Sequence, residues 1–195
     1  MYRRLLVVSM VLGGLTLAAC GGAPPPEPPA PEPEPMAEGP DMDSLRAYED
    51  SVRQSQEEAA RLAAEAERAI ADARATLEQR VHFDYDESAI RSDTQAILRE
   101  KVAILRASPQ VQIRLEGHAD ERGSTEYNQA LGNRRAQSVL DFLTAQGISS
   151  GALQATSFGE ERPLSTASNE SAWAQNRRVE FVITSGGGSI NPAGE

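Results

Sequence analysis

Aromatic residues and positive charge are both scarce in this 195-residue chain. Phe, Trp and Tyr make up 5% of it, and 19 Lys and Arg stand against 29 Asp and Glu. Few rings are available to stack on bases or sugars, and binding to nucleic-acid phosphates favours an excess of basic residues. The composition argues against a nucleic-acid partner and indicates that recognition depends on a few placed polar groups.

Cysteine and histidine are rare as well. Cys20 is the only cysteine, so no thiol remains downstream for a disulfide, a metal site or a nucleophile. Glu116, His118 and Asp120 form an E-x-H-x-D string, but a single histidine without a second one nearby is weak evidence for zinc. The sequence has no Walker loop or dinucleotide fingerprint. We therefore expect no metal, no cofactor and no enzymatic activity.

A membrane-spanning helix needs about 20 apolar residues, and no apolar run in this sequence is that long. Two arginines precede the apolar residues 5–17, which are too few to span a bilayer and suit a signal peptide. The next string, Leu17-Ala18-Ala19-Cys20, resembles the lipobox of bacterial lipoproteins. That resemblance implies removal of residues 1–19 and a lipid anchor on Cys20, and Gly21 after the cysteine favours the outer membrane. The alternative is an ordinary secretory signal that leaves a free cysteine.

Two segments of unusual composition follow the cysteine. Residues 20–43 hold nine of the twelve prolines and predict an extended linker. Residues 44–80 are rich in Ala, Glu, Arg and Gln, contain no Gly or Pro, and predict a helix. Its apolar positions recur near heptad spacing, but many are alanines that bury little area. We favour a solvated spacer over a weak coiled coil or a partner-binding helix.

Alternating apolar residues mark strands in the segment 81–184. Val81, Phe83 and Tyr85 form one such set; the others are Val111, Ile113 and Leu115, and Val179, Phe181 and Ile183. A weaker strand is expected over 153–158. Alternation, in place of continuous apolar runs, predicts a sheet covered by helices on one face only.

Helices are expected between these strands. A capping box, Ser92-x-x-Gln95, opens the first, Thr125 caps the second, which ends at Gly147, and a short one lies near 170–175. The order βαβαβαβ predicts a two-layer α/β sandwich with a mixed sheet, in the α+β sense. Residues 185–195, which are rich in glycine, are expected to be a flexible tail.

Three groups of strings in this segment carry a family resemblance. They are Phe83-Asp84-Tyr85-Asp86; Gly117-His118-Ala119-Asp120-Glu121-Arg122-Gly123 with Tyr127-Asn128 and Leu131-Gly132-Asn133-Arg134-Arg135-Ala136; and Asn176-Arg177-Arg178-Val179. They resemble the OmpA-like peptidoglycan-binding domain family, and within it the lipid-anchored Pal group. The resemblance covers essentially all of 81–184, with the strings in the family's order and spacing.

The resemblance implies noncovalent binding of the peptidoglycan stem peptide at the free end of its diaminopimelate side chain, which carries an ammonium and a carboxylate. By position in the strings, Asp120 accepts the ammonium and Arg135 takes the carboxylate. Asp86 adds a polar contact, and His118 and Ala119 offer backbone hydrogen bonds. The remaining candidate ligand-binding residues are Tyr85, Asn128 and Arg178.

Each candidate also has a purely structural interpretation. Asp120 and Arg135 could form a salt bridge with each other. Asn128 could cap the start of a helix, and Arg178 could either fix the loops of the site or lie exposed on the surface. These alternatives stay open at the level of the sequence.

The expected function is a lipid-anchored, noncatalytic tether between the outer membrane and the cell wall, with its domain in the periplasm. By resemblance to the Pal group, the propeller protein TolB of the Tol system is an expected partner during cell division. The alternative is an envelope scaffold that binds other proteins through the helical spacer, outside the Tol system.

Overall fold

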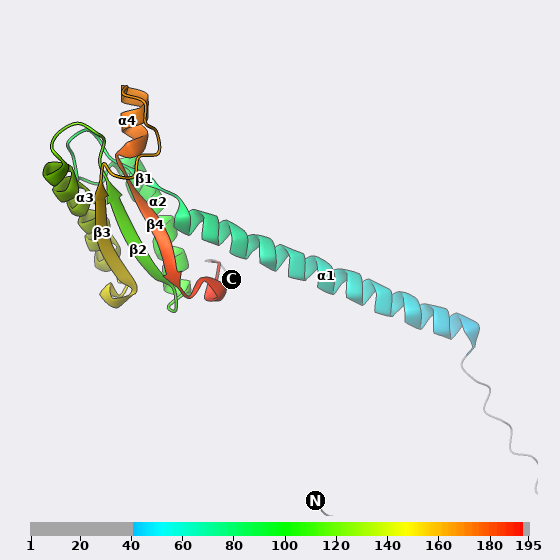
Figure 1. Cartoon of the computed structure of the whole chain (residues 1–195). Coiled ribbons are helices and arrows are strands. Elements are labelled where there is room, and N and C mark those ends of the chain that lie inside the picture. Colours follow the sequence, from blue (N-terminus) through cyan, green and yellow to red (C-terminus); the bar gives the residue numbers. More distant parts are fainter. Residues whose placement is uncertain (1–40, 193–195) are drawn as a thin grey trace, which may run out of the picture. The chain divides into compact units, whose positions relative to one another are not determined.

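The computed structural model describes residues 41–192, and the lipobox, Cys20 and most of the proline-rich segment lie outside that range. Its elements are α1 (Met42–Glu78), β1 (Val81–His82), α2 (Ser92–Ala107), β2 (Gln112–His118), α3 (Thr125–Ala145), η1 (Ser150–Ala152), β3 (Leu153–Gly159), α4 (Glu170–Asn176), β4 (Arg178–Ser185) and η2 (Gly187–Ser189) (Figure 1). From β1 to β4 the predicted order βαβαβαβ is confirmed. Within the described residues, no helix has the length and apolar character needed to cross a bilayer.

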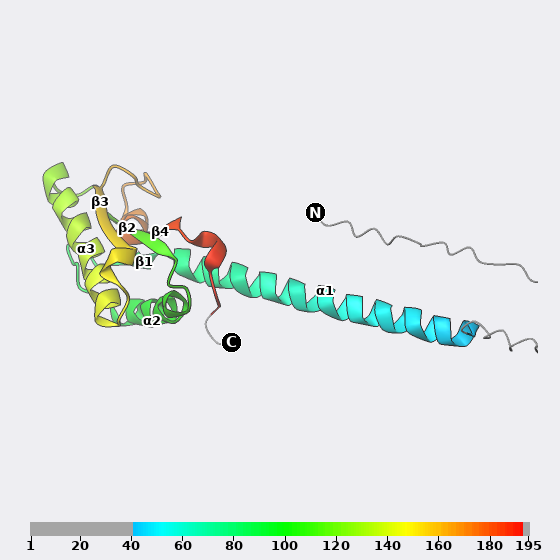
Figure 2. The ribbon, with the colours of Figure 1, turned by 90° about the horizontal axis from the view of Figure 1, so that it is seen from below.

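One mixed sheet of four strands organises the domain. The strands lie in the order β1-β4-β2-β3; β2 and β3 are parallel, whereas β4 is antiparallel to both β1 and β2. Figure 2 shows α2 and α3 on the same face of this sheet. The predicted two-layer α+β architecture, with helices on one face, is therefore confirmed.

The core lies between the sheet and these helices, where the alternating apolar residues meet. Leu115 of β2 pairs with Phe181 of β4, and Ile113 pairs with Ile183. Leu115 is fully buried, and it faces apolar side chains such as Leu98 from α2. Because successive strand residues point to opposite faces, the polar residues of β2 lie on the face away from α2 and α3.

The C-terminal end of α1 belongs to the domain core. Ala73 and Leu77 are buried in the same apolar cluster as the sheet. The fully buried Lys101 of α2 closes this end of the helix. Its Nζ donates to the carbonyl oxygens of Thr76, Leu77 and Gln79 at 2.6, 2.8 and 2.7 Å. A cation at the end of a helix also complements the helix dipole. The predicted loosely attached spacer is thus wrong for the last turns of α1.

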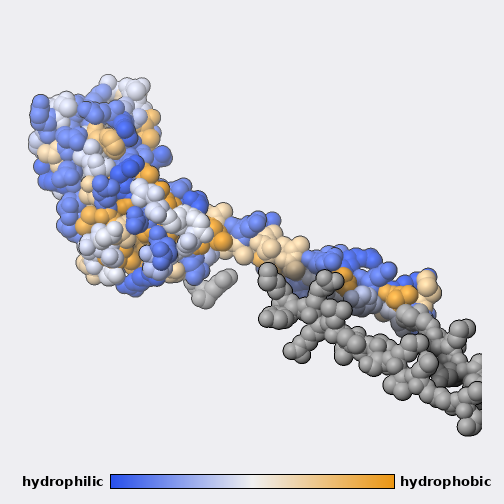
Figure 3. Space-filling model, turned by 60° about the horizontal axis from the view of Figure 1, so that its bottom comes forward, coloured by the Kyte–Doolittle hydropathy of each residue, from blue (hydrophilic) through white to orange (hydrophobic). Residues whose placement is uncertain are grey.

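The earlier turns of α1 are largely exposed, as expected for a spacer. Tyr48, Leu62 and Ile70 are apolar residues on this exposed stretch. Figure 3 shows hydrophobic and hydrophilic residues interspersed along α1 in that view, without one continuous hydrophobic stripe. The observed helix runs two residues earlier at each end than the predicted 44–80.

The segment after β4 differs from the predicted flexible tail. Ile190 is 4% exposed and packs in the core cluster. The backbone N–H of Asn191 donates to Ser108 Oγ at 2.8 Å, and Arg74 of α1 donates to the carbonyl oxygen of Gly187. The apolar side chain of Ile190 explains the packing, because burying it stabilises the segment by roughly 1.5–3 kcal/mol.

Three local predictions also need correction. β1 contains only Val81–His82, and Tyr85 is 58% exposed, so the alternation does not extend as a strand to Tyr85. The Ser92 capping box does not form: the N-cap of α2 is Arg91, without a side-chain cap bond. The cap of α3 is Ser124, whose side chain accepts the Tyr127 N–H, and not Thr125.

Replacing Lys101 by methionine is expected to lower the free energy of unfolding by about 2 kcal/mol. Three charge-assisted hydrogen bonds are lost and three carbonyls of α1 are left without their donor. Removing a buried ammonium offsets part of this loss, because burial lowers the pKa of Lys101 to about 7. Urea unfolding and hydrogen exchange in the last turn of α1 measure the change. The control is Arg99→Met on the exposed face of α2, for which a change within about 0.5 kcal/mol is expected.

Candidate functional site

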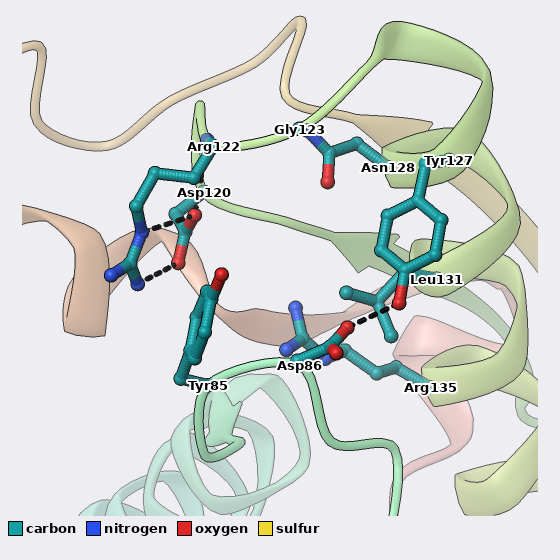
Figure 4. Close-up of a pocket in the computed structure, with 9 residues that line it drawn as sticks. All are labelled: Tyr85, Asp86, Asp120, Arg122, Gly123, Tyr127, Asn128, Leu131 and Arg135. Atoms are coloured by element: carbon teal, nitrogen blue, oxygen red, sulfur yellow. Dashed lines mark hydrogen bonds and ion pairs between the residues drawn. The ribbon is translucent and has the colours of Figure 1, made fainter.

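A polar cavity of about 240 Å³ lies at the carboxyl end of β2. It is formed by the turn after β1, the loop after β2 and the first turns of α3 (Figure 4). Its lining residues are Tyr85, Asp86, Asp120, Arg122, Gly123, Tyr127, Asn128, Leu131 and Arg135. Five of the predicted site residues, Tyr85, Asp86, Asp120, Asn128 and Arg135, thus meet at one cavity.

Asp120 is 4% exposed and is held by two arginines. Arg122 forms a two-point pair with its carboxylate, at 3.0 Å from Nε to Oδ1 and 2.7 Å from Nη2 to Oδ2. Arg177 Nη1 donates to Oδ2 at 3.3 Å. Burial disfavours the ionised carboxyl, but these hydrogen bonds outweigh it and lower the pKa of Asp120. Asp120 is therefore a carboxylate at neutral pH.

Arg135 is fully buried, and its guanidinium is fixed by backbone carbonyls. It donates to Glu87 O at 2.8 Å, to His118 O at 2.8 Å and to Asp84 O at 3.0 Å. Burial lowers the pKa of Arg135 to about 10, so the group stays charged. A guanidinium has five N–H donors, and these three bonds leave two of them for a guest. No hydrogen bond or ion pair joins Arg135 to Asp120, although both line the cavity.

Asp86 lies across the cavity mouth from the loop of Asp120. Tyr127 Oη donates a hydrogen bond to its carboxylate, which raises the pKa of Tyr127 (Figure 4). Asp86 has a φ of 58°, and it is the only residue other than glycine with positive φ in the described part of the chain. Such a conformation is unfavourable for most side chains and is found at sites where the surrounding structure imposes it.

The cavity also holds Asn128, which is 1% exposed. Its side-chain amide donates to Glu160, so it ties the start of α3 to the loop after β3. The side chain that caps this helix belongs to Ser124. The alternative of a capping role for Asn128 is therefore wrong.

Three predicted site residues lie outside the cavity lining. The His118 side chain belongs to the sheet face away from the cavity, and its carbonyl is occupied by Arg135. The Ala119 N–H donates to Gly159 O at 2.8 Å, so it is not free for a ligand. Arg178 is 2% exposed and donates to the carbonyls of Asn176 and Arg162, which favours the alternative in which it fixes loops.

The sequence did not predict three residues that bond to the predicted site residues: Arg122 and Arg177, which bind Asp120, and Tyr127, which binds Asp86. Arg122 stands two positions after Asp120, a spacing at which a turn can fold the guanidinium back onto the carboxylate. Arg177 is 57 positions from Asp120, and no local pattern in the sequence links them. The alternative of an Asp120–Arg135 salt bridge is therefore wrong, because Asp120 pairs with Arg122 and Arg177.

Glu116, His118 and Glu180 form the one cluster among residues 41–192 with ligand atoms close enough for a metal, all within 4.8 Å of one another. Both carboxylates are already engaged by guanidinium groups. Arg114 Nε donates to Glu116 at 2.7 Å, and Arg178 Nε donates to Glu180 at 2.6 Å. These positive charges oppose a further cation, so the arrangement fits an ion-pair network better than a metal site.

Comparison with known proteins identifies the domain. The model of the OmpA family matches residues 82–177. The crystal structure of the peptidoglycan-associated lipoprotein from Burkholderia pseudomallei is 38% identical, with a TM-score of 0.54, and the match covers 54% of this chain and 90% of that one. The chain belongs to the OmpA family.

Curated relatives of this OmpA-family chain share its domain. The peptidoglycan-associated lipoprotein of Brucella melitensis biotype 1 is 44% identical over 108 residues, which is 55% of this chain and 64% of the relative. The peptidoglycan-associated lipoprotein of Pseudomonas aeruginosa is 46% identical over 100 residues, which is 51% of this chain and 59% of the relative. The match thus spans about three fifths of the length of these relatives. The C-terminal domain of Helicobacter pylori MotB, 21% identical with a TM-score of 0.51, shares the fold.

Proposed function

We propose that the cavity binds peptidoglycan noncovalently, by gripping the free end of a diaminopimelate side chain. One observation carries this proposal: a buried guanidinium with spare donors and two carboxylates, Asp86 and Asp120, line the same cavity of about 240 Å³. The free end of diaminopimelate carries an ammonium and a carboxylate on one carbon. A zwitterion of this size needs opposite charges on two sides of a small cavity.

Arg135 is the carboxylate receptor in this proposal. A planar guanidinium presents paired N–H groups that match a carboxylate better than a lysine ammonium does. Because three backbone carbonyls already fix its position, little side-chain entropy is lost on binding. Asp86 and Asp120 then receive the ammonium, and Tyr85 closes the side of the cavity.

The role is binding without catalysis. The ionisable groups of the cavity are held by counter-charges, by carbonyls or, for Asp86, by a tyrosine hydroxyl. This pattern suits static recognition of a charged group.

The names of the relatives, which describe lipoproteins associated with peptidoglycan, support the wider proposal for the whole protein. Residues 1–19 are a signal peptide, acylated Cys20 anchors the chain in the outer membrane, and 20–43 and 44–80 carry the domain 81–184 toward the wall. By resemblance to the Pal group we extend the proposal to the Tol system, with TolB as a partner in cell division.

Arg135→Lys is expected to weaken the binding of diaminopimelate about ten- to a hundredfold, because one charge-assisted hydrogen bond contributes about 1.5–3 kcal/mol. Titration calorimetry with free diaminopimelate measures the affinity of a single site, and sedimentation with purified sacculi measures binding to the wall. Sacculi present many sites, so their binding falls less steeply.

The matched control is Arg134→Lys, an exposed arginine one position earlier on α3, which is expected to bind as the wild type does. Nα-acetyl-L-lysine amide serves as a control ligand, because its α groups are blocked and it has the side-chain ammonium with no carboxylate beside it. A folded Arg135→Lys variant with undiminished affinity would remove Arg135 from the site.

A further inference from the structure

The Asp120 carboxylate has no acceptor position left for a guest. Oδ1 accepts the backbone N–H and the Nε of Arg122 at 3.1 and 3.0 Å. Oδ2 accepts Arg122 Nη2 at 2.7 Å and Arg177 Nη1 at 3.3 Å. A carboxylate offers about four lone-pair sites, and four donors fill them. An ammonium can reach Asp120 only if one of these donors leaves.

The Arg122 side chain is the donor that can leave. Arg177 is buried, and its guanidinium is also bonded to the Phe83 carbonyl and to Glu170. Arg122 is more exposed, with 28% of its side chain accessible, and the bonds of its guanidinium to Asp120 are side-chain bonds that rotation can break. In Figure 4 it approaches Asp120 from the loop at the rim of the cavity.

The position of the Arg122 guanidinium is a built cation site. The central carbon of the guanidinium lies 3.9 Å from the centre of the Tyr85 ring and 4.2 Å from the centre of the Trp173 ring. Tyr85 is also a lining residue of the cavity. The Trp173 indole N–H donates to Glu121 at 3.0 Å, which holds that ring in place. Glu170 lies 3.7 Å from Nη1. Two aromatic faces and a carboxylate are the surroundings that favour any cation.

We propose that Arg122 is an internal cation that occupies the position of the guest's ammonium, competes with it for Asp120 and so limits the affinity of the cavity. This inference rests on the proposed function and deepens it. A guest displaces Arg122 only if its own contacts repay the broken two-point ion pair. A simple amine gains nothing at Arg135, whereas a zwitterionic amino-acid end binds Arg135 with its carboxylate and Asp120 with its ammonium.

The competition lowers the affinity for every cationic guest by the same factor, so a guest that lacks the carboxylate, and binds weakly to begin with, falls below detection. Only the fraction of molecules with Arg122 displaced is competent to bind at Asp120, and the apparent affinity falls by that fraction. The common factor leaves the ratio of affinities of two guests unchanged, and that ratio is set by the contact of the guest's carboxylate with Arg135.

Arg122→Gln is therefore expected to bind free diaminopimelate about tenfold more tightly than the wild type, and to bind Nα-acetyl-L-lysine amide measurably where the wild type does not. Titration calorimetry on the purified full-length chain gives both affinities. Arg122→Lys keeps a one-point ion pair and is expected to lie between the two, which also covers the case in which the glutamine variant fails to fold. Arg134→Gln is the control for loss of one positive charge near the cavity.

A second readout follows Arg122 itself. On adding diaminopimelate to the wild type, the Arg122 Nε–H resonance is expected to shift as it leaves Asp120, and the Arg177 Nε–H resonance to stay in place. Weaker or unchanged diaminopimelate binding by folded Arg122→Gln and Arg122→Lys would overturn the inference while leaving the proposed function intact. Failure of the wild type to bind diaminopimelate at all would overturn both.

Discussion

Gly117→Ala is expected to destabilise the domain by about 4 kcal/mol, more than overpacking usually costs. A Cβ at this position would lie 1.8 Å from the carbonyl oxygen of Gly132 and 2.6 Å from its carbonyl carbon. Both atoms belong to the backbone of α3, and Gly117 lies in the central strand β2. The clash therefore cannot be relieved by rotating a side chain. Urea unfolding monitored by circular dichroism measures the loss.

The damage should extend to the cavity. β2 leads directly into Asp120, and α3 carries Arg135, so separating α3 from β2 moves the two halves of the site apart. A folded fraction of Gly117→Ala is therefore expected to lose diaminopimelate binding as well. Gly132→Ala should be destabilising but milder, because the Ser157 hydroxyl at 2.3 Å can turn away and the nearest backbone atom, the carbonyl oxygen of Gly117, lies 2.8 Å from the added Cβ.

Gly188→Ala is the matched control, because a Cβ there meets nothing within 4 Å. A change within about 0.5 kcal/mol is expected for it. If the free energy of unfolding of Gly117→Ala lies within about 1 kcal/mol of the wild-type value, the close approach of α3 to β2 is not a feature of the folded protein.

The order of elements could be predicted because each core strand carries its own signal. Leu115 and Phe181 lie in strands whose apolar residues alternate, and such a period is readable without knowing the partner strand. The length of β1 could not be predicted in this way. The partner β4 begins only at Arg178, and Phe83 N–H makes one further bond to Arg177 O at 2.9 Å before the pairing stops. The alternation of Val81, Phe83 and Tyr85 carries no information about that limit.

Five of the eight predicted binding residues line the cavity, but the bonds that hold them could not be predicted. The family resemblance indicated Asp120 and Arg135 as site residues, and both line the same cavity. Their partners depend on the three-dimensional path of the chain: Arg177 reaches Asp120 from the end of α4, and Arg135 is bonded to carbonyls in the loop after β1 and at the end of β2. Such contacts leave no periodic trace in a sequence. The packed Ile190 was missed for a related reason, since one isoleucine among glycines and serines has no pattern around it.

Lowering the pH from 7 to 5 is expected to destabilise the domain by about 2 kcal/mol through His118 alone. The residue is 1% exposed, and neither ring nitrogen has a hydrogen-bond partner within residues 41–192. Burial, assisted by the positive charge of Arg178, lowers the pKa of His118 from 6.5 to about 4. The unfolded chain therefore binds a proton at His118 near pH 6.5, whereas the folded domain binds it only near pH 4. Stability falls as the pH falls through this range and levels off below it.

The groups around His118 explain why the folded domain resists this proton. The ring stacks on Phe158 with 5.7 Å between centroids, and it lies among ionised side chains of both signs: Arg80, Glu116, Arg162, Arg178 and Glu180. Both carboxylates are already paired with arginines, so they attract the proton only weakly. The carboxyl groups with lowered pKa, such as Asp120, lose their contribution only near and below their ordinary values of about 4. Lys101, whose pKa is lowered to about 7, adds a smaller fall in stability that ends at about pH 6. The rest of the range from pH 7 to 5 is left to histidine.

His118→Phe is the variant that isolates this effect. Phenylalanine keeps the ring stack on Phe158 and removes both unpaired nitrogens, so its stability at pH 7 is expected to match or exceed that of the wild type. Its free energy of unfolding should be nearly flat from pH 7 to 5, where the wild type declines. His82→Gln, at the exposed second histidine, should keep most of the wild-type slope. Urea unfolding at half-unit steps of pH gives the three curves, and a slope in His118→Phe equal to that of the wild type would mean that His118 is not the group that takes up the proton.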